Sequence, residues 1–428
     1  MRALHTIIRK ALPSSIAGRS RATRGLWNGM LFTVIFSLSA FFSCMPEPPL
    51  HLYDAVDSDF RLPVIDLDLQ VYWDYELAFG IDYDWRAEWY YGWDNEDRRV
   101  WGEIGYTEPT TFNIRRYYTG DVPYAPHTSV LRNTIEGTHF QGRFDWGFWD
   151  ILVWNQIYTL NGVHSLIFDE ETTLDSVTAY TNQSMNVARY NAPRYTHSFW
   201  SPEPLFAAYD QAIDINTDLK DFTFDEERQV YTRTLNMLLE PITYIYLTQV
   251  IIHHNYGRVV STDGNANLSG MARSTNLNTG RAGEEPITVY YNTRLKNDVP
   301  YYGPDGAKWS TGLGETNGPA PAMTEVVDVV GGRLLTFGMC SQRPNRISRA
   351  EHVTDEHRHY LDVNMQFNNG MDSTLVFDVT DQVRRRYKGG VITVELDMDT
   401  VPLPNRRGGS GFNAVVVEPD SLTYEIDM

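Results

Sequence analysis

Cys44 is the residue whose type and position point most directly to a chemical modification. It follows Ser43 at the end of an uncharged apolar run, residues 30–42, and the residues ahead of that run include six basic and no acidic side chains. A short apolar run behind a basic segment is typical of a secretory signal peptide. Lipoprotein processing requires a small residue directly before a cysteine, because the chain is cut there and the thiol is diacylated. We therefore predict a signal peptide over residues 1–43 and a lipid on Cys44; the alternative is an ordinary signal peptide with a chance cysteine.

The apolar run is too short to stay in a membrane as a helix. It holds 13 residues, whereas a hydrocarbon core of roughly 30 Å needs about 20 apolar residues. The next segment, residues 44–60, is rich in proline at first and acidic afterwards, as expected for a tether between a membrane surface and a folded part. We therefore expect membrane attachment through the lipid and not through a spanning helix.

The charge of the chain argues against polyanionic partners. Removal of residues 1–43, with their six basic side chains, moves the net charge from -19 to -25 and leaves 385 of the 428 residues. Binding to nucleic acid or to anionic headgroups depends on Lys and Arg that neutralise phosphate. We predict no nucleic-acid partner. A chain of this length is expected to form two domains, each with its own core.

The remaining cysteine and a pair of histidines are better explained by structure than by chemistry. Cys340 ends an apolar stretch, residues 334–339, where an inert buried thiol is expected and not a nucleophile. If Cys44 carries lipid, Cys340 has no disulfide partner within the chain. His253-His254 ends another apolar segment, and on a strand the two rings would point to opposite faces.

The densest group of metal-ligand residue types is EHVTDEHRH, residues 351–359. On a strand, His357 and His359 would share one face, and Asp355 or Glu356 could complete a site. No second clear cluster accompanies them in the sequence. A solvated polar turn therefore explains the segment better, and we predict no metal site.

Neighbouring acidic residues could in principle serve as general acid and base. Examples are Asp82 with Asp84 and Asp225 with Glu226, but a chain with 55 acidic residues contains such pairs by chance. A glycosidase needs two carboxylates across a cleft, which a sequence does not show. GxSxG, Walker, HExxH and CxxC motifs are absent from the sequence. We predict no catalytic residue, no cofactor and no enzymatic activity.

Four tryptophans lie among charged residues within residues 80–102: Trp85, Trp89, Trp93 and Trp101. Indole rings can stack on the apolar faces of sugars. They can equally pack a small core, because aromatic side chains dominate the energetics of cores. The sequence favours packing but leaves both interpretations open, so these four residues are also candidates for glycan binding.

The pattern of apolar residues predicts many short strands. Residues 63–77 alternate apolar and polar side chains, as a strand with one solvated face does. Residues 242–254 are apolar on both faces, as a strand covered on both sides is. Pro241, just ahead of them, is expected to break the ladder and to mark a domain crossing. Further strands are predicted at 111–118, 148–154, 162–168, 176–181, 229–239, 266–278, 287–295, 333–339, 360–367, 374–379, 391–397 and 412–426.

Few segments fit a helix. Residues 201–213, SPEPLFAAYDQAI, fit a short one, because the serine could cap it and the first proline suits its first position. A helical turn is expected at 381–387, and hairpins are expected around 368–370 and 389–390. Many short strands with almost no long amphipathic pattern predict an all-β protein built of sandwiches.

Five segments resemble a family of Bacteroidales lipoproteins that is known only as a domain of unknown function. That family looks related to the fimbrillin superfamily, the lipoprotein-derived subunits and anchors of Bacteroidetes surface pili. The resemblance covers nearly all of residues 60–428, and its motifs are structural and not catalytic. The segments are DILVWN (150–155), SLIFDEETTLDSVTAYTN (165–182), SPEPLF (201–206), NLSGMARSTNLNTG (267–280) and FDVTDQV (377–383).

The resemblance implies two tandem transthyretin-like (fimbrillin-like) β-sandwich domains after the signal peptide and tether. We place these domains at residues 61–235 and 236–428. The resemblance also implies a lipid-anchored protein of the outer membrane, at the cell surface, with a role in adhesion or pilus assembly. Its partners would be fimbrial subunits or ligands on host or bacterial surfaces. The alternative is a glycan-binding surface lipoprotein that uses residues 85–101.

Fimbrillins polymerise by strand exchange, and the resemblance raises that question here. In fimbrillins a trypsin-like protease removes an N-terminal strand, and a neighbouring subunit donates a replacement to the open sheet edge. Arg98-Arg99 and Arg115-Arg116 are candidate cleavage points. The C-terminal run, residues 414–426, could complete its own domain or serve as a donor.

Overall fold

The computed structural model describes residues 62–72, 83–156, 166–170, 177–182, 198–341 and 357–404, together with the strand backbone at 415–416. The predicted signal peptide, Cys44 and the tether lie outside these residues. The described residues belong to one unit that begins at Leu62. None of the helices in these ranges is long and apolar enough to cross a membrane.

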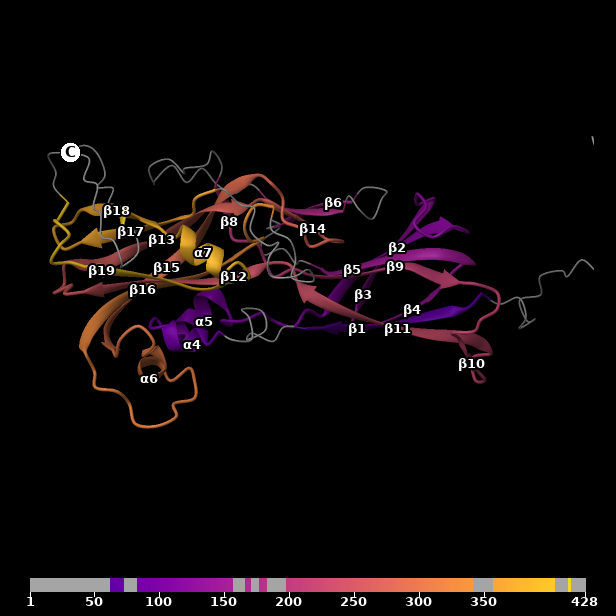
Figure 1. Cartoon of the computed structure of the whole chain (residues 1–428), viewed down its shortest axis with the longest axis horizontal. Coiled ribbons are helices and arrows are strands. Elements are labelled where there is room, and N and C mark those ends of the chain that lie inside the picture. The colour runs from indigo at the N-terminus through magenta and orange to yellow at the C-terminus, as the bar shows by residue number, and fades with distance from the viewer. Residues whose placement is uncertain are drawn as a thin grey trace, which may run out of the picture. The chain divides into compact units, whose positions relative to one another are not determined.

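Most of the described chain is β-strand, arranged as two large sheets and a small one (Figure 1), which confirms the mostly β prediction. The first sheet follows the order β3-β2-β5-β9-β11-β1-β4, with β10 beside β11. Its strands are β1 (Val64–Val71), β2 (Thr111–Gly120), β3 (Ser129–Glu136), β4 (His139–Arg143), β5 (Gly147–Asn155), β9 (Phe206–Ile215), β10 (Thr223–Asp225) and β11 (Val230–Pro241).

The first sheet is strongly curved. Strands β3 and β4 stand at the two ends of the path, yet only Gly137 and Thr138 connect them. Six strand spacings of about 4.8 Å add up to about 29 Å, whereas a two-residue connection reaches only about 10 Å. The sheet must therefore curve so that the adjoining ends of β3 and β4 come close to each other, and the predicted sandwich stays a prediction. Gly137 has φ +82°, a left-handed conformation that suits a glycine at such a tight turn.

β1 lies inside the first sheet and not at its edge. It runs parallel to β11 over all eight of its residues, and antiparallel to β4 on its other side. Ile65, Leu67 and Leu69 are at most 2% exposed, whereas Asp66 and Asp68 on the other face are partly exposed. The predicted strand with one polar face is thus confirmed for the described residues.

The second sheet follows the order β19-β12-β16-β15-β13-β17-β18-β20, with β8 beside β15. β11 of the first sheet ends at Pro241, which still pairs with Phe206 of β9, and the chain then enters β12 of the second sheet at Tyr244. The domain crossing predicted at Pro241 stays a prediction. The limits predicted for the two domains, 61–235 and 236–428, stay predictions. The strands of the second sheet are β8 (Ser198–Trp200), β12 (Tyr244–His253), β13 (Val259–Ala272), β15 (Pro286–Tyr301), β16 (Glu325–Thr336), β17 (Tyr360–Phe367), β18 (Asp372–Asp378), β19 (Gly390–Asp397) and β20 (Val415–Val416).

β12 is covered on both faces, as predicted. Leu247 and Ile251 on one face belong to a core that also contains the buried residues of β1 and β5. Val250 and Ile252 on the other face belong to a second core, which is made by β13, β17 and β18. Because successive residues of a strand point to opposite faces, the continuous apolar pattern of β12 serves two cores.

Short helices and a small sheet complete the described part. The small sheet has the order β14-β7-β6, so it joins segments that lie far apart in the sequence. The helix α7 confirms the helical turn predicted at 381–387. The elements are α4 (Trp85–Glu88), α5 (Asn95–Trp101), α6 (Ala307–Thr311), α7 (Thr380–Arg385), β6 (Leu166–Asp169), β7 (Thr178–Thr181) and β14 (Ser274–Asn276).

The helix predicted at residues 201–213 is wrong. The segment enters β9 at Phe206, and β9 pairs with β5 along most of its length and with the end of β11. Pro202 and Pro204 favour an extended backbone for the residues that precede them. Pairing on both sides then outweighs the helix propensity of the alanines.

One predicted hairpin is confirmed and the other is wrong. β17 and β18 pair antiparallel around residues 368–370. After Gly389 the chain enters β19, which pairs with β12 at the other end of the sheet and not with β18. Strands β3 and β4 were not predicted, because their side chains are mostly exposed and polar and carry little apolar signal.

Candidate functional site

The four candidate tryptophans lie in and around α4 and α5. Trp85, Trp89 and Trp93 are 3%, 0% and 7% exposed, and the partly buried Trp101 packs with its ring centroid 5.4 Å from that of Trp93. A sugar needs an open indole face, and here the faces are taken up by protein. The structure therefore places these residues in a core, and glycan binding at this segment stays a prediction that requires the rings to leave it.

Gln249 on β12 joins this tryptophan-rich segment to the second sheet. Its Oε1 accepts hydrogen bonds from the backbone N–H groups of Tyr90 and Tyr91, at 2.9 and 3.2 Å. Its Nε2 donates to Glu88 O at 2.6 Å and to Thr393 Oγ1 at 2.9 Å. The amide is 1% exposed, and these four bonds use both of its donors and both acceptor sites of its oxygen.

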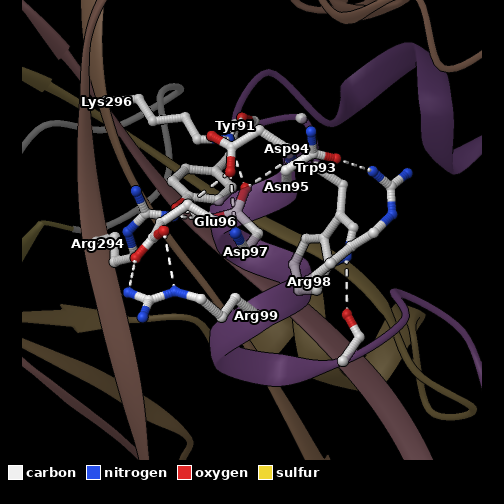
Figure 2. A network of polar contacts seen from close by, with 12 residues as sticks. Tyr91, Trp93, Asp94, Asn95, Glu96, Asp97, Arg98, Arg99, Arg294 and Lys296 are labelled. Atoms are coloured by element: carbon white, nitrogen blue, oxygen red, sulfur yellow. Dashed lines mark hydrogen bonds and ion pairs between the residues drawn. The ribbon is translucent and has the colours of Figure 1, made fainter.

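A group of polar and charged residues also connects α5 to the second sheet. We call it the Asp97 network; its members are Tyr91, Asp94, Asp97, Arg294 and Lys296 (Figure 2). The Asp97 side chain is fully buried and accepts hydrogen bonds from Tyr91 OH at 2.8 Å, Lys296 Nζ at 2.6 Å and Arg294. Asp94 and Asp97 also form a capping box at the start of α5. A buried carboxylate is costly unless it is paired and hydrogen-bonded, and here two cations from β15 provide that pairing.

Asp94 shares the same cations. Burial opposes ionisation of its carboxyl, but hydrogen bonds from the Asp97 N–H and from Lys296, and the charges of Lys296 and Arg294, outweigh this and hold the pKa of Asp94 well below its usual range. Gly331 on β16 makes room for the Tyr91 ring, since a Cβ there would lie 2.2 Å from Cγ of that ring. The Asp97 network therefore holds α5 on the second sheet.

A different group of titratable residues lies where β12 and β19 end and β16 begins. We call it the His254 cluster; its members are His253, His254, Glu325, Glu395, Asp397 and Asp399. The prediction that the two histidines point to opposite faces is wrong. β12 ends at His253, and His254 has φ +53°, so the chain turns there. As a result both rings approach Glu325: His253 Nδ1 lies 2.9 Å from Oε1, and His254 Nε2 lies 4.0 Å from Oε2.

The closest pair of the cluster alters the charge state of both partners. His254 Nδ1 lies 3.0 Å from Asp397 Oδ1. This hydrogen bond raises the pKa of the His254 imidazole and lowers the pKa of the Asp397 carboxyl. The sequence did not reveal this cluster, because its members are spread over residues 253–399 and meet only through strand pairing.

The predicted histidine segment at 351–359 does not present two rings on one strand face. Residues 351–356 lie outside the described residues, and His357 and His359 precede β17. His359 is fully buried, with Nδ1 3.2 Å from Ser269 O. These two histidines therefore do not form the strand-face pair that a metal site here would need.

The remaining candidates have structural surroundings. Cys340 is buried, as predicted. Asp225 accepts hydrogen bonds from the backbone N–H groups of Glu227 and Arg228, as in a turn. Arg115-Arg116 lies within β2, between β3 and β5, where a protease has no access, whereas Arg98-Arg99 lies on the exposed side of α5.

The protein is mostly β, with two large sheets. The Asp97 network and the His254 cluster each join residues from different elements. No family model and no curated protein matches the chain. Solved structures do. The chain is similar to an adhesin candidate from Bacteroides ovatus (TM-score 0.42, 13% identity, 81% of this chain and 96% of that chain covered).

Two further similar structures come from Porphyromonas gingivalis. One is the fimbrial anchor protein Mfa2 (TM-score 0.35, 11% identity, 78% of this chain and 90% of that chain). The other is the tip fimbrial protein Mfa3 (TM-score 0.29, 7% identity, 86% of this chain and 99% of that chain). All three structures are similar to this chain at low sequence identity.

Proposed function

We propose that this chain is a lipid-anchored outer-membrane protein that acts without catalysis, through protein–protein contacts, in adhesion or pilus assembly. The observation that carries the proposal is the place of β1. Val64 follows Cys44 by 20 residues, which span at most about 70 Å. A lipid on Cys44 would keep β1 within about 70 Å of the membrane surface, and β1 is paired on both sides, with β11 and β4.

The position of β1 also bears on strand exchange. β1 pairs with β4 and β11, and Ile65, Leu67 and Leu69 fill the first core. The first sheet is therefore complete without a strand from another subunit. In the second sheet, Val415–Val416 pairs with β18, which favours a C-terminal run that completes its own sheet over one that is donated. Both features support an anchor or a stand-alone surface protein over a repeating pilus subunit.

Metabolic labelling tests the anchor. Cells that express the wild type and the Cys44→Ala variant are grown with radiolabelled palmitate, and membrane and soluble fractions are compared. We expect label and membrane attachment for the wild type and loss of both for the variant. Wild-type protein that carries no label and is released in soluble form would refute the proposal.

An immunoblot of unboiled and boiled cell extracts tests the proposal that the first sheet needs no strand from another subunit. Donor-strand polymers resist detergent until heated, because a whole strand of hydrogen bonds and buried side chains must be lost together. We expect a single band in both lanes. A ladder that collapses on boiling would show a polymerising subunit and would contradict the anchor or stand-alone role.

A further inference from the structure

The His254 cluster has features that the Asp97 network lacks. β12 and β19 run parallel, with His253 opposite Asp397, so both strands finish at the same place. β16 is antiparallel to β12, so its first residue, Glu325, lies at the same place. Strand pairing therefore brings imidazoles and carboxylates together at one end of the second sheet.

The atoms of three of these residues match the needs of a metal ion. His254 Nδ1 lies 3.0 Å from Asp397 Oδ1 and 3.8 Å from Asp399 Oδ2, and all three ligand atoms lie within 4.8 Å of one another. Zinc bonds to nitrogen and oxygen at about 2.0–2.2 Å, which puts tetrahedral ligands about 3.4 Å apart. The three atoms thus need only small side-chain movements to share one ion. We infer that His254, Asp397 and Asp399 form a binding site for a divalent transition-metal ion of the zinc type.

The other nitrogen of His254 supports this assignment. Ligating histidines usually direct their second ring nitrogen at a carboxylate, which orients the ring. His254 Nε2 faces Glu325 Oε2 at 4.0 Å, and His253 Nδ1 in turn holds Glu325 Oε1 at 2.9 Å. Metal ligation through Nδ1 therefore leaves Nε2 on the side of Glu325, whose carboxylate is 4.0 Å away and is held by His253.

The negative charge of the His254 cluster also favours binding of a divalent cation. Its four carboxylates are Glu325, Glu395, Asp397 and Asp399, and within the described residues their ion pairs are all with His253 or His254. With neutral imidazoles the cluster carries four negative charges and no fixed cation in these pairs. A divalent ion at the ligand set offsets part of this repulsion.

The donor set favours zinc over calcium or magnesium. Calcium takes six to eight oxygen ligands and magnesium keeps several waters, whereas imidazole with carboxylates suits zinc and its neighbours. Three protein ligands leave a fourth position open. The side chains of His254, Asp397 and Asp399 are 42%, 43% and 61% exposed, so an ion reaches the site from solvent.

Titration calorimetry with zinc chloride alone tests the inference. The purified full chain is first treated with EDTA and dialysed. We expect one zinc ion per chain, and binding weaker by at least 100-fold in His254→Ala and in the double variant Asp397→Asn/Asp399→Asn. Glu325→Gln, which removes only the orienting carboxylate, should weaken binding by about 10- to 100-fold. Asp221→Asn changes an exposed acid of the first sheet's loops and is the matched control with unchanged affinity.

Cobalt absorption separates a ligand effect from loss of folding. Cobalt bound to nitrogen and oxygen ligands in the wild type should give visible absorption bands that His254→Ala lacks, while circular dichroism without metal stays the same for both proteins. The inference is overturned if the wild type binds no zinc, or if zinc binds His254→Ala and the double variant as tightly as the wild type.

Discussion

The Asp97 network and the His254 cluster both gather acidic residues on the second sheet, but they balance charge in different ways. Asp97 is fully buried and forms ion pairs with Arg294 and Lys296. The carboxylates of the His254 cluster are partly exposed, and within the described residues their ion pairs are with imidazoles. An acid paired with a fixed cation holds a structure together. An acid paired with an imidazole leaves charge that protons or metal ions can balance.

The comparison predicts a large loss of stability when Asp97 loses its charge. Asp97→Asn keeps the shape but leaves Arg294 and Lys296 without their buried partner. Breaking a buried pair costs about 3–5 kcal/mol; because Asp94 remains beside both cations, we expect about 3 kcal/mol. Urea unfolding followed by tryptophan fluorescence measures it, since the tryptophans pack beside α5. As the control, Asp221→Asn should change the free energy of unfolding by no more than about 0.5 kcal/mol. If Asp97→Asn lowered it by less than about 1 kcal/mol, the Asp97 network would not be the stabilising cluster that the comparison requires.

Acid should weaken the Asp97 network through Asp94. The pKa of Asp94 lies below its usual value of about 3.9, so its contribution to stability is complete above that value. It is lost as the pH falls towards the folded pKa, because the unfolded chain takes up the proton first. The side chain is half exposed, so solvent screening limits the effect to about 1 kcal/mol. Urea midpoints from pH 5 to pH 2 should fall less steeply for Asp94→Asn than for wild type, and parallel slopes would contradict this.

The smallest effect is expected in the His254 cluster without metal. Asp399→Asn removes one exposed carboxylate from a group with excess negative charge. In EDTA we expect unchanged stability or a gain of up to about 0.5 kcal/mol. Thermal unfolding in EDTA measures it. If Asp399→Asn lowered the free energy of unfolding by more than about 1 kcal/mol, Asp399 would stabilise the fold as Asp97 does. The two clusters would then not differ in the way described.

The strands of this fold were predictable where burial leaves a local pattern. β1 alternates apolar and polar residues because one of its faces is buried, and β12 is mostly apolar because both of its faces are buried. Each pattern could therefore be recognised in the sequence. Residues 201–213 were predicted to be a helix because Ser201 and Pro202 suit a helix start, but the pairing of β9 overrides these local signals.

The sites were harder to predict, because they depend on distant pairings. Asp97 and Arg294 are 197 residues apart, and His254 and Asp397 are 143 residues apart. Nothing local in the sequence links them. Gly331-Gly332, in the middle of an apolar strand, was one usable signal: paired glycines there indicate a close approach, and Tyr91 occupies the space beside Gly331.

The parallel pairing of β1 and β11 has a mechanical consequence. The chain enters β1 from the side of Cys44 and leaves β11 towards the second sheet. In a parallel pair, tension between these two points pulls the strands lengthwise in opposite directions. The register from Val64 opposite Thr232 to Val71 opposite Leu239 is then loaded in shear, so its hydrogen bonds resist together. Stretching the chain in an optical trap should show this as a single high-force rupture of the first sheet. A force applied between the N-terminal side of β1 and the second sheet would therefore be carried by all the hydrogen bonds of this pair at once.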